Sequence, residues 1–333
     1  DDVKSAGIPL PSALGAWLTR EAPEHSAPWQ PLALPALEPA ASGRASRGEA
    51  EAADNTLPVL VYLPGIMGSH LAADGNRIWL DAFDLARGRL ARIAMDSHKT
   101  VREDGLVGLA YGRLADHLET SHRVIRHDYD WRQPIQTLGA ELALVLRAAL
   151  NTHPDQPLRI LAHSMGGLLV RAAFAADKTL WADIVARPGG RLLMLGTPNH
   201  GSHLFVETLL GQSDTIRMLA RLDLRQGMQA VLDIVAGFPG ALHLLPAPGF
   251  EDAGGLADKD YYRAEAWTEL AAINNDFWFG KTLAGKPTQA LLDQARDFWG
   301  ALADTRWVDL APERVAYVFG QAENTPCGIL LQT

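Results

Sequence analysis

From Leu57 onward, short apolar segments alternate with longer segments of helical periodicity, and this alternation limits the folds open to the chain. The apolar segments are LPVLVYL (57–63), RVIRH (123–127), LRILA (158–162), RLLML (191–195) and RVAYVF (314–319). The helical patterns between them lie near 107–120, 134–150 and 165–177. Strands that alternate with helices and are apolar on both faces indicate a parallel sheet covered on both sides. The sequence therefore predicts an α/β fold.

The same pattern divides the chain. Residues 1–56 are rich in Pro, Ala, Ser, Gly and Glu without a sustained period, so we expect a loosely ordered N-terminal arm. The remainder, 57–333, is predicted to be one domain. Between the fourth and fifth strands, mostly helical sequence takes over, and an insertion of this size predicts a helical cap at about 203–300.

Composition excludes several classes of protein. The 333 residues are 47% hydrophobic with a net charge of -9, so the chain can bury a sizeable core, and its charge disfavours nucleic acid as a partner. The single cysteine, Cys327, excludes an internal disulfide and a thiolate metal cluster. We expect no signal peptide and no transmembrane helix. The compartment stays open, with the cytoplasm favoured, and so does the oligomeric state.

The stretch LRILAHSMGGLLVR, 158–171, places a serine where an apolar strand gives way to a helix. In this setting the G-x-S-x-G motif forms a nucleophile elbow, a tight turn that strains the serine and needs small neighbours. Ala162 and Gly166 are small, and Gly167 lets the helix pack closely. Although a serine here could merely cap the helix, we predict that Ser164 is a nucleophile.

Two backbone amides are candidates for an oxyanion hole. The helix after Ser164 points its first free N–H groups, beginning at Met165, toward the place where an oxyanion would form. The segment LVYLPGIMGSHL, 60–71, puts a Pro-Gly turn after an early strand, where an α/β-hydrolase supplies its other oxyanion N–H. Such a turn by itself is often only a turn. Paired with the later elbow, it makes the Ile66 amide the second predicted donor.

Four motifs follow one another along the chain: LVYLPGIMGSHL, HDYDWRQPI (127–135), LAHSMGGLLVR and LGTPNHGS (195–202). In this order and spacing they resemble the lecithin:cholesterol acyltransferase and lysosomal phospholipase A2 family of α/β-hydrolases. YDWR, 129–132, is the most discriminating motif, because the others are shared with many lipases and esterases. The resemblance implies an α/β-hydrolase fold, the roles given above to Ser164, Ile66 and Met165, and acyl-ester chemistry on lipids.

The YDWR tetrad itself has two interpretations. Trp131 could line an acyl-chain slot while Asp130 and Arg132 pair to hold the loop, or the tetrad could be a structural aromatic with an ion pair.

Several histidines lie near the predicted motifs. His200 and His203 are three residues apart, but a metal site needs more ligands, and we predict neither a metal nor a cofactor. His163 is a poor base for its neighbour, since a strand-to-helix turn directs adjacent side chains apart. His243 lies in the cap region.

The partners of the serine are missing from the expected places. In this fold an Asp or Glu follows a late strand, and a His follows later still. Glu323, three residues past Gly320, is the candidate acid, although the family resemblance implies an acid after a further loop. No histidine follows His243. The chain is then a fragment that lacks the C-terminal part of the fold and is inactive alone, or a pseudo-hydrolase, or His200 or His203 acts as the base.

We expect a serine-dependent lipid acyl hydrolase or O-acyltransferase that works through an acyl-enzyme on Ser164, with a lipid or other acyl ester as substrate. The alternative is a non-catalytic binding or scaffold module on the same fold. The cap either walls the acyl pocket or is ordinary core, and the aromatics concerned are Trp267, Phe277, Trp278 and Phe279.

Overall fold

The centre of the molecule is a five-stranded parallel sheet with the strand order β6-β2-β7-β8-β9. The structure is a computed structural model that describes residues 17–21, 57–79, 89–98, 100–222, 227–250, 260–273, 287–320 and 324–329. The strands of the sheet are β2 (Val59–Leu63), β6 (Arg123–Arg126), β7 (Leu158–His163), β8 (Arg191–Leu195) and β9 (Val315–Val318). Each coincides with one of the predicted apolar segments, and the predicted α/β class is confirmed.

Helices cover both faces of this sheet. They are α3 (Gly108–Leu118), α4 (Ile135–Thr152), α5 (Met165–Ala176) and α6 (Leu180–Val185). Because side chains alternate across a strand, Val61 of β2 joins the main core with α4 and α5, while its neighbour Tyr62 joins a second core with Tyr111 of α3. Both β2 side chains are almost fully buried, as strands covered on both sides require.

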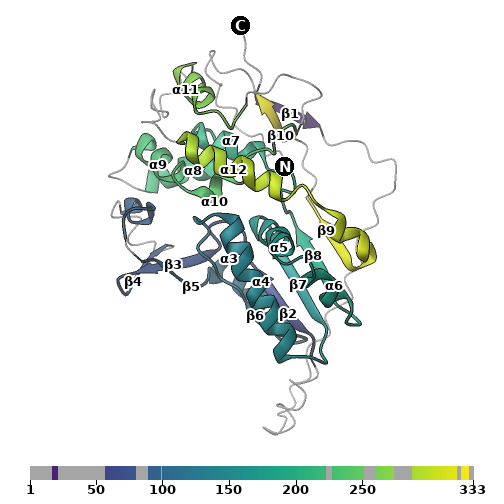
Figure 1. Cartoon of the computed structure of the whole chain (residues 1–333). Helices are drawn as coiled ribbons and strands as arrows, with labels where there is room; N and C mark the ends of the chain where they lie inside the picture. The colour runs from purple at the N-terminus through teal and green to yellow at the C-terminus, as the bar shows by residue number, and fades with distance from the viewer. Residues whose placement is uncertain are drawn as a thin grey trace, which may run out of the picture.

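The helices between β8 and β9 gather over one end of the sheet (Figure 1). These cap helices are α7 (His203–Leu209), α8 (Asp214–Leu222), α9 (Met228–Val235), α10 (Pro239–Leu242), α11 (Ala264–Ile273) and α12 (Gln289–Ala301). Two short 3-10 helices, η2 (Arg306–Leu310) and η3 (Pro312–Arg314), lead into β9. The exact limits of the predicted cap and domain stay predictions.

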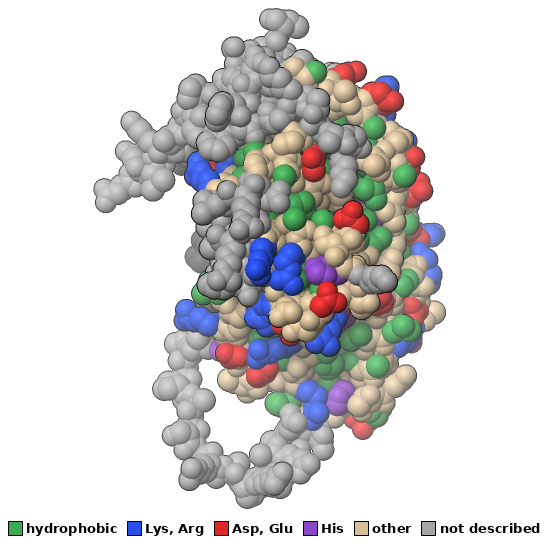
Figure 2. All heavy atoms as spheres, turned by 90° about the vertical axis from the view of Figure 1, so that its left-hand side faces the viewer, with side chains coloured by type: hydrophobic (Ala, Val, Ile, Leu, Met, Phe, Trp, Pro, Cys, Tyr) green, Lys and Arg blue, Asp and Glu red, His purple; other side chains and the backbone are tan. Residues whose placement is uncertain are grey.

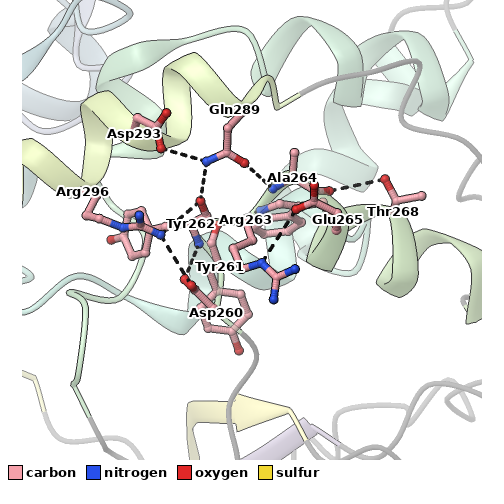
Figure 3. Close-up of polar contacts among 11 residues, drawn as sticks. Asp260, Tyr261, Tyr262, Arg263, Ala264, Glu265, Thr268, Gln289, Asp293 and Arg296 are labelled. Carbon is pink, nitrogen blue, oxygen red and sulfur yellow. Dashed lines mark hydrogen bonds and ion pairs between the residues drawn. The ribbon is translucent and has the colours of Figure 1, made fainter.

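One glutamine joins two of the cap helices (Figure 3). The Gln289 Oε1 atom accepts from the Ala264 amide at 2.9 Å, which satisfies a free N–H in the first turn of α11. Its Nε2 atom donates to the Tyr262 carbonyl at 2.9 Å and to Asp293 at 2.8 Å. The start of α11 is thereby tied to the first turns of α12.

Two smaller sheets were not predicted from the sequence pattern. β3 (Ser69–Ala73), β4 (Asn76–Trp79) and β5 (Arg102–Leu106) form an antiparallel sheet, and the 3-10 helix η1 (Leu90–Ile93) follows β4. Asp74 and Gly75 connect β3 to β4 with φ of 52° and 75°, the positive values that an Asp-Gly hairpin turn requires. In addition, β1 (Trp17–Glu21) pairs with β10 (Asn324–Ile329). The segment expected to be a loosely ordered arm therefore contributes a strand, while the rest of 1–56 lies outside the described residues.

Two features of the described residues concern a membrane or a charged partner. Within the described ranges, no helix combines the length and apolar character needed to cross a membrane. Figure 2 shows acidic and basic side chains interleaved with apolar ones on one face of the molecule. Where both signs interleave, their fields largely cancel over short distances.

Candidate active site

Ser164 occupies a strained turn between β7 and α5. Its φ is 52° and its ψ is -123°, a conformation that costs a residue with a side chain about 1–3 kcal/mol and is typical of functional sites. The Ser164 amide donates to the Leu195 carbonyl of β8 at 2.8 Å, which anchors the turn to the sheet. The serine side chain makes no capping hydrogen bond to α5. The turn has the strained backbone that the predicted elbow requires, and its serine forms no side-chain helix cap.

The small residues around the serine are required by close contacts. A Cβ atom at Gly166 would lie 2.6 Å from the Pro64 carbonyl oxygen and 3.0 Å from the Leu63 Cβ atom. A Cβ atom at Gly167 would overlap the side chain of Thr197. These glycines let α5 start directly against β2 and the segment after β8.

The loop between β2 and β3, residues 64–68, runs against the serine. A Cβ atom at Gly65 would lie only 2.9 Å from the Ser164 Cβ atom. Met67 in this loop has a φ of 62°, so a second strained residue lies beside the first. Neither the Ile66 amide nor the Met165 amide donates to an acceptor in the part of the chain that the structure describes. The predicted donors are thus placed on the loop and on the first turn of α5, the two elements that flank Ser164.

The YDWR tetrad packs against this loop. The Asp130 carboxylate receives two hydrogen bonds from the Arg132 guanidinium, at 2.8 and 2.7 Å, and both side chains are buried. Arg132 also donates to the Ile93 carbonyl at 2.8 Å. The Trp131 indole donates to the Ser69 carbonyl at 3.2 Å, and its ring lines a cavity. The tetrad is therefore both a loop support and part of a cavity wall.

That cavity has a volume of about 300 Å³ and includes Ser164 in its wall. Its lining comes from the 64–68 loop, from Trp79 and Trp131, and from cap residues such as Phe205 and Leu219. Most of the lining is apolar, and its polar side chains are serine and threonine hydroxyls. Among the described residues that line it, there is no titratable side chain. Such a space suits a hydrocarbon chain better than a charged group.

The expected aromatic wall of the cap differs from what is found. Trp267 is 1% exposed, donates to the Tyr261 carbonyl at 2.8 Å and belongs to the main core without lining the cavity. Phe277, Trp278 and Phe279 lie outside the described residues. Trp267 is thus an ordinary core residue of the cap.

Four histidines considered from the sequence have separate environments. The His163 ring is held by Tyr111, whose hydroxyl lies 2.9 Å from its Nδ1 atom, and burial lowers the pKa of His163. His200 is exposed and stacks on Phe250, and His203 is buried in α7. Neither of these two lines the cavity.

His243 is the most deeply buried of the four. Its Nδ1 atom accepts from the Ile135 amide at 3.1 Å, and its ring stacks on Phe298. Burial lowers the pKa of His243 to about 3, so the ring is neutral at physiological pH. It serves as a core acceptor at the start of α4.

Glu323 lies outside the described residues, just beyond the end of β9. The described ranges contain no cluster of three or more His, Cys, Asp or Glu side chains arranged for a metal ion.

Sequence reasoning missed Tyr111. Its hydroxyl accepts from the Gly65 amide at 2.9 Å, across 46 positions of the chain. The surrounding sequence, GLAYGRL, has only an ordinary helical pattern, and no local signal marks a contact over this distance.

No protein-family model matches the chain, and no curated protein matches it. The chain is similar to a chain in the crystal structure of the Tle4–Tli4 complex, with 15% identity over 74% of this chain and 72% of that chain and a TM-score of 0.47. It is similar to Bacillus licheniformis lipase BlEst2 in its mature form, with 20% identity over 55% and 56% of the two chains and a TM-score of 0.30.

A third similarity is to a structure from work on carboxylesterases of the ammonia-oxidizing thaumarchaeon Nitrososphaera gargenis, with 14% identity over 80% and 83% of the two chains and a TM-score of 0.27. These distant similarities carry no argument about activity, and the resemblance to the acyltransferase family stays a prediction. The fold follows from the chain itself. Its parallel strand order and the strained serine turn at the end of β7 are those of the α/β-hydrolase fold.

Proposed function

We propose that the chain carries the nucleophile and acyl pocket of a serine-dependent acyl hydrolase or O-acyltransferase that acts on lipid esters. The observation that carries this proposal is the strained Ser164 in the wall of an apolar cavity, between two elements whose Ile66 and Met165 amides have no acceptor among the described residues. A strained turn is retained where it positions a reactive group.

In the proposed mechanism the Ser164 oxygen attacks the ester carbonyl and forms a tetrahedral intermediate. The Ile66 and Met165 amides donate hydrogen bonds to the oxyanion, where the positive end of the α5 dipole adds to the stabilisation. Collapse of the intermediate expels the alcohol and leaves an acyl group on Ser164. The acyl group then passes to water, which is hydrolysis, or to a second alcohol, which is transfer.

The cavity supports a substrate with one buried hydrocarbon chain. A volume of about 300 Å³ is at the small end of the range for ligand sites. One acyl chain fits such a space while the rest of the ester stays outside. Each methylene taken from water into this lining contributes about 0.8 kcal/mol to binding.

The proposed mechanism also needs a general base and an acid, and neither is found among the described residues of the site. No described histidine lines the cavity. We therefore assign the general base to a residue outside the described part of the protein, and Glu323, also outside it, is the candidate for the acid that orients this base.

The absence of a titratable group from the described cavity lining favours a second candidate, a pseudo-hydrolase that binds an acyl chain without turnover. It shares the apolar cavity with the enzyme and differs only in the reactivity of Ser164.

Labelling of the full-length protein with a fluorophosphonate separates the two candidates. If the protein is an enzyme, we expect rapid labelling that is lost in Ser164→Ala. The labelling should be kept in Ser121→Ala, which removes an exposed hydroxyl that does not line the cavity. A folded full-length protein that takes no label, yet binds a fluorescent fatty acid, is the result that favours the pseudo-hydrolase. A second assay distinguishes transfer from hydrolysis. The protein is given an ester with a radioactive acyl group together with a long-chain alcohol. A radioactive free acid indicates hydrolysis, and a radioactive ester of the added alcohol indicates transfer.

A further inference from the structure

One peptide group in the 64–68 loop is held at both of its polar atoms by tyrosine hydroxyls. The Tyr129 hydroxyl donates to the Pro64 carbonyl at 2.8 Å, and the Gly65 amide donates to the Tyr111 hydroxyl at 2.9 Å. The Pro64 carbonyl and the Gly65 amide belong to the same planar peptide unit. This unit cannot rotate without breaking at least one of the two bonds.

The Tyr111 hydroxyl also reaches the serine turn. It lies 2.9 Å from the Nδ1 atom of His163, the residue before Ser164. A phenol has one proton, and its oxygen here already accepts from Gly65, so its own proton is available for the His163 ring nitrogen. Burial lowers the pKa of His163, which agrees with a neutral ring that accepts at Nδ1. A single hydroxyl thereby joins the 64–68 loop to the serine turn.

A glycine at position 65 makes such a restraint necessary. Glycine is required because a Cβ atom there would lie 2.9 Å from the Ser164 Cβ atom and 3.1 Å from the His163 ring. Glycine also has the widest backbone freedom of all residues. The next amide along the chain belongs to Ile66, and its direction depends on the torsions of Gly65. An external restraint at the preceding peptide removes part of this freedom.

We propose that Tyr111 and Tyr129 are positioning residues that fix the Pro64–Gly65 peptide and so aim the Ile66 amide at the carbonyl oxygen of an ester bound at Ser164. The aim at the ester rests on the proposed function, whereas the restraint on the peptide does not. Neither tyrosine touches the reacting atoms.

The two tyrosines reach this peptide from different elements. Tyr111 lies on α3 and Tyr129 lies between β6 and α4, and both side chains are buried. Buried peptide groups need hydrogen-bond partners in any protein, so a purely structural role is the competing explanation. It predicts a loss of stability on removal of a hydroxyl, but no selective loss of turnover.

The test compares full-length wild type with Tyr111→Phe, Tyr129→Phe and Tyr262→Phe. Tyr262 is the matched control, because its buried hydroxyl donates to the Pro246 carbonyl at 2.8 Å, far along the chain from the 64–68 loop. Hydrogen exchange of the Gly65 amide, followed by NMR on protein labelled with [15N]glycine, reports the restraint without any need for activity. Steady-state kinetics on a p-nitrophenyl ester report its consequence.

We expect the Gly65 amide of Tyr111→Phe to exchange about tenfold faster than in wild type, as for one lost hydrogen bond. We expect kcat of Tyr111→Phe and of Tyr129→Phe to fall about tenfold, with KM within about twofold of the wild-type value. A misdirected Ile66 amide affects the transition state more than it affects substrate binding. Tyr262→Phe is expected to match wild type in both measurements.

Unchanged exchange at Gly65 in Tyr111→Phe overturns the restraint. Faster exchange with unchanged kcat overturns the positioning role and leaves the structural explanation. A wild-type protein in which Ser164 takes no fluorophosphonate and hydrolyses no ester refutes the proposed function and, with it, the aim at an ester. The exchange measurement in that same protein still decides for or against the restraint on the peptide.

Discussion

Gly65 is a residue at which the 64–68 loop approaches the serine turn closely. A methyl group there would meet the Ser164 Cβ atom at 2.9 Å, the His163 Nδ1 atom at 3.1 Å and the Tyr111 hydroxyl at 3.3 Å. We expect Gly65→Ala to push the loop away from Ser164 and to lower kcat by about 100-fold, the usual effect of losing one oxyanion donor. Kinetics of the full-length protein on a soluble ester measure this effect. The control is Gly300→Ala in α12, where an added methyl meets nothing within 4 Å; equal kcat in the two variants would contradict the contact.

His243 makes the stability of the fold depend on pH. Its pKa is lowered to about 3 in the folded protein, whereas the unfolded chain has the ordinary value of 6.5. Between these values the unfolded state binds the extra proton, so the group destabilises the fold as the pH falls from 6.5 toward 3, by up to about 1.4 kcal/mol per pH unit. Protonation of Nδ1 would also break its hydrogen bond from Ile135.

Urea unfolding between pH 4.5 and 7 checks this dependence. His243→Gln keeps an acceptor for the Ile135 amide without a titrating ring, and we expect its stability to fall less steeply with decreasing pH than that of wild type. His117→Gln on the exposed face of α3 is the control and should keep the wild-type slope. Identical slopes in all three proteins would show that His243 is not the responsible group.

At the scale of whole elements, the helices α4 and α5 approach each other closely at Gly139. A Cβ atom at Gly139 of α4 would lie 2.8 Å from the carbonyl carbon of Ala172 in α5 and closer still to its methyl group. We expect Gly139→Ala to separate the helices and to lower the free energy of unfolding by about 1–3 kcal/mol, despite the better helix propensity of alanine. Gly112→Ala in α3 meets nothing within 4 Å and should stabilise the protein by about 0.5–1 kcal/mol. Thermal unfolding of both variants gives the comparison, and a stabilised Gly139→Ala would refute the close packing.

Helices and strands with a continuous apolar pattern were predicted well from the sequence. Strands that are formed mainly by hydrogen bonds to a neighbouring strand, without such a pattern, were not. The central strands and the helices α3, α4 and α5 each have an apolar pattern long enough to identify them. β5 has the sequence REDGL and is almost wholly exposed, so it has no apolar pattern. The hairpin of β3 and β4 is marked in the sequence by the Asp74-Gly75 dipeptide. Its turn needs two residues with a positive φ, and Asp followed by Gly is a favoured pair for such a turn.

Across the whole molecule, the site is only partly predictable from sequence. Ser164 and its small neighbours could be found because an elbow requires them at fixed spacing. The cavity wall could not be predicted, because Trp79, Phe205 and Leu219 come together only when the β3–β4 hairpin and the cap close over the sheet. Tyr111 is hidden for the same reason, since its contact with Gly65 spans 46 positions.

The closure of the cap over the sheet also sets the length of chain that the cavity accepts. Ala241 of α10 lines this cavity and is 1% exposed, so a larger side chain there has only the cavity to occupy. We expect Ala241→Leu to exclude two or three methylenes of a long acyl chain. At about 0.8 kcal/mol each, kcat/KM for a long-chain p-nitrophenyl ester falls roughly 15- to 60-fold.

The short-chain butyrate ester, which does not reach the added side chain, should keep its wild-type kcat/KM. Ala110→Leu on the exposed face of α3 is the control for a general effect of the substitution, and Ala241→Val provides a milder change if Ala241→Leu unfolds. The measurement is the ratio of kcat/KM for the two esters in full-length protein. A ratio that stays at the wild-type value in a folded Ala241→Leu would mean that the acyl chain lies outside this cavity, whatever the reactivity of Ser164.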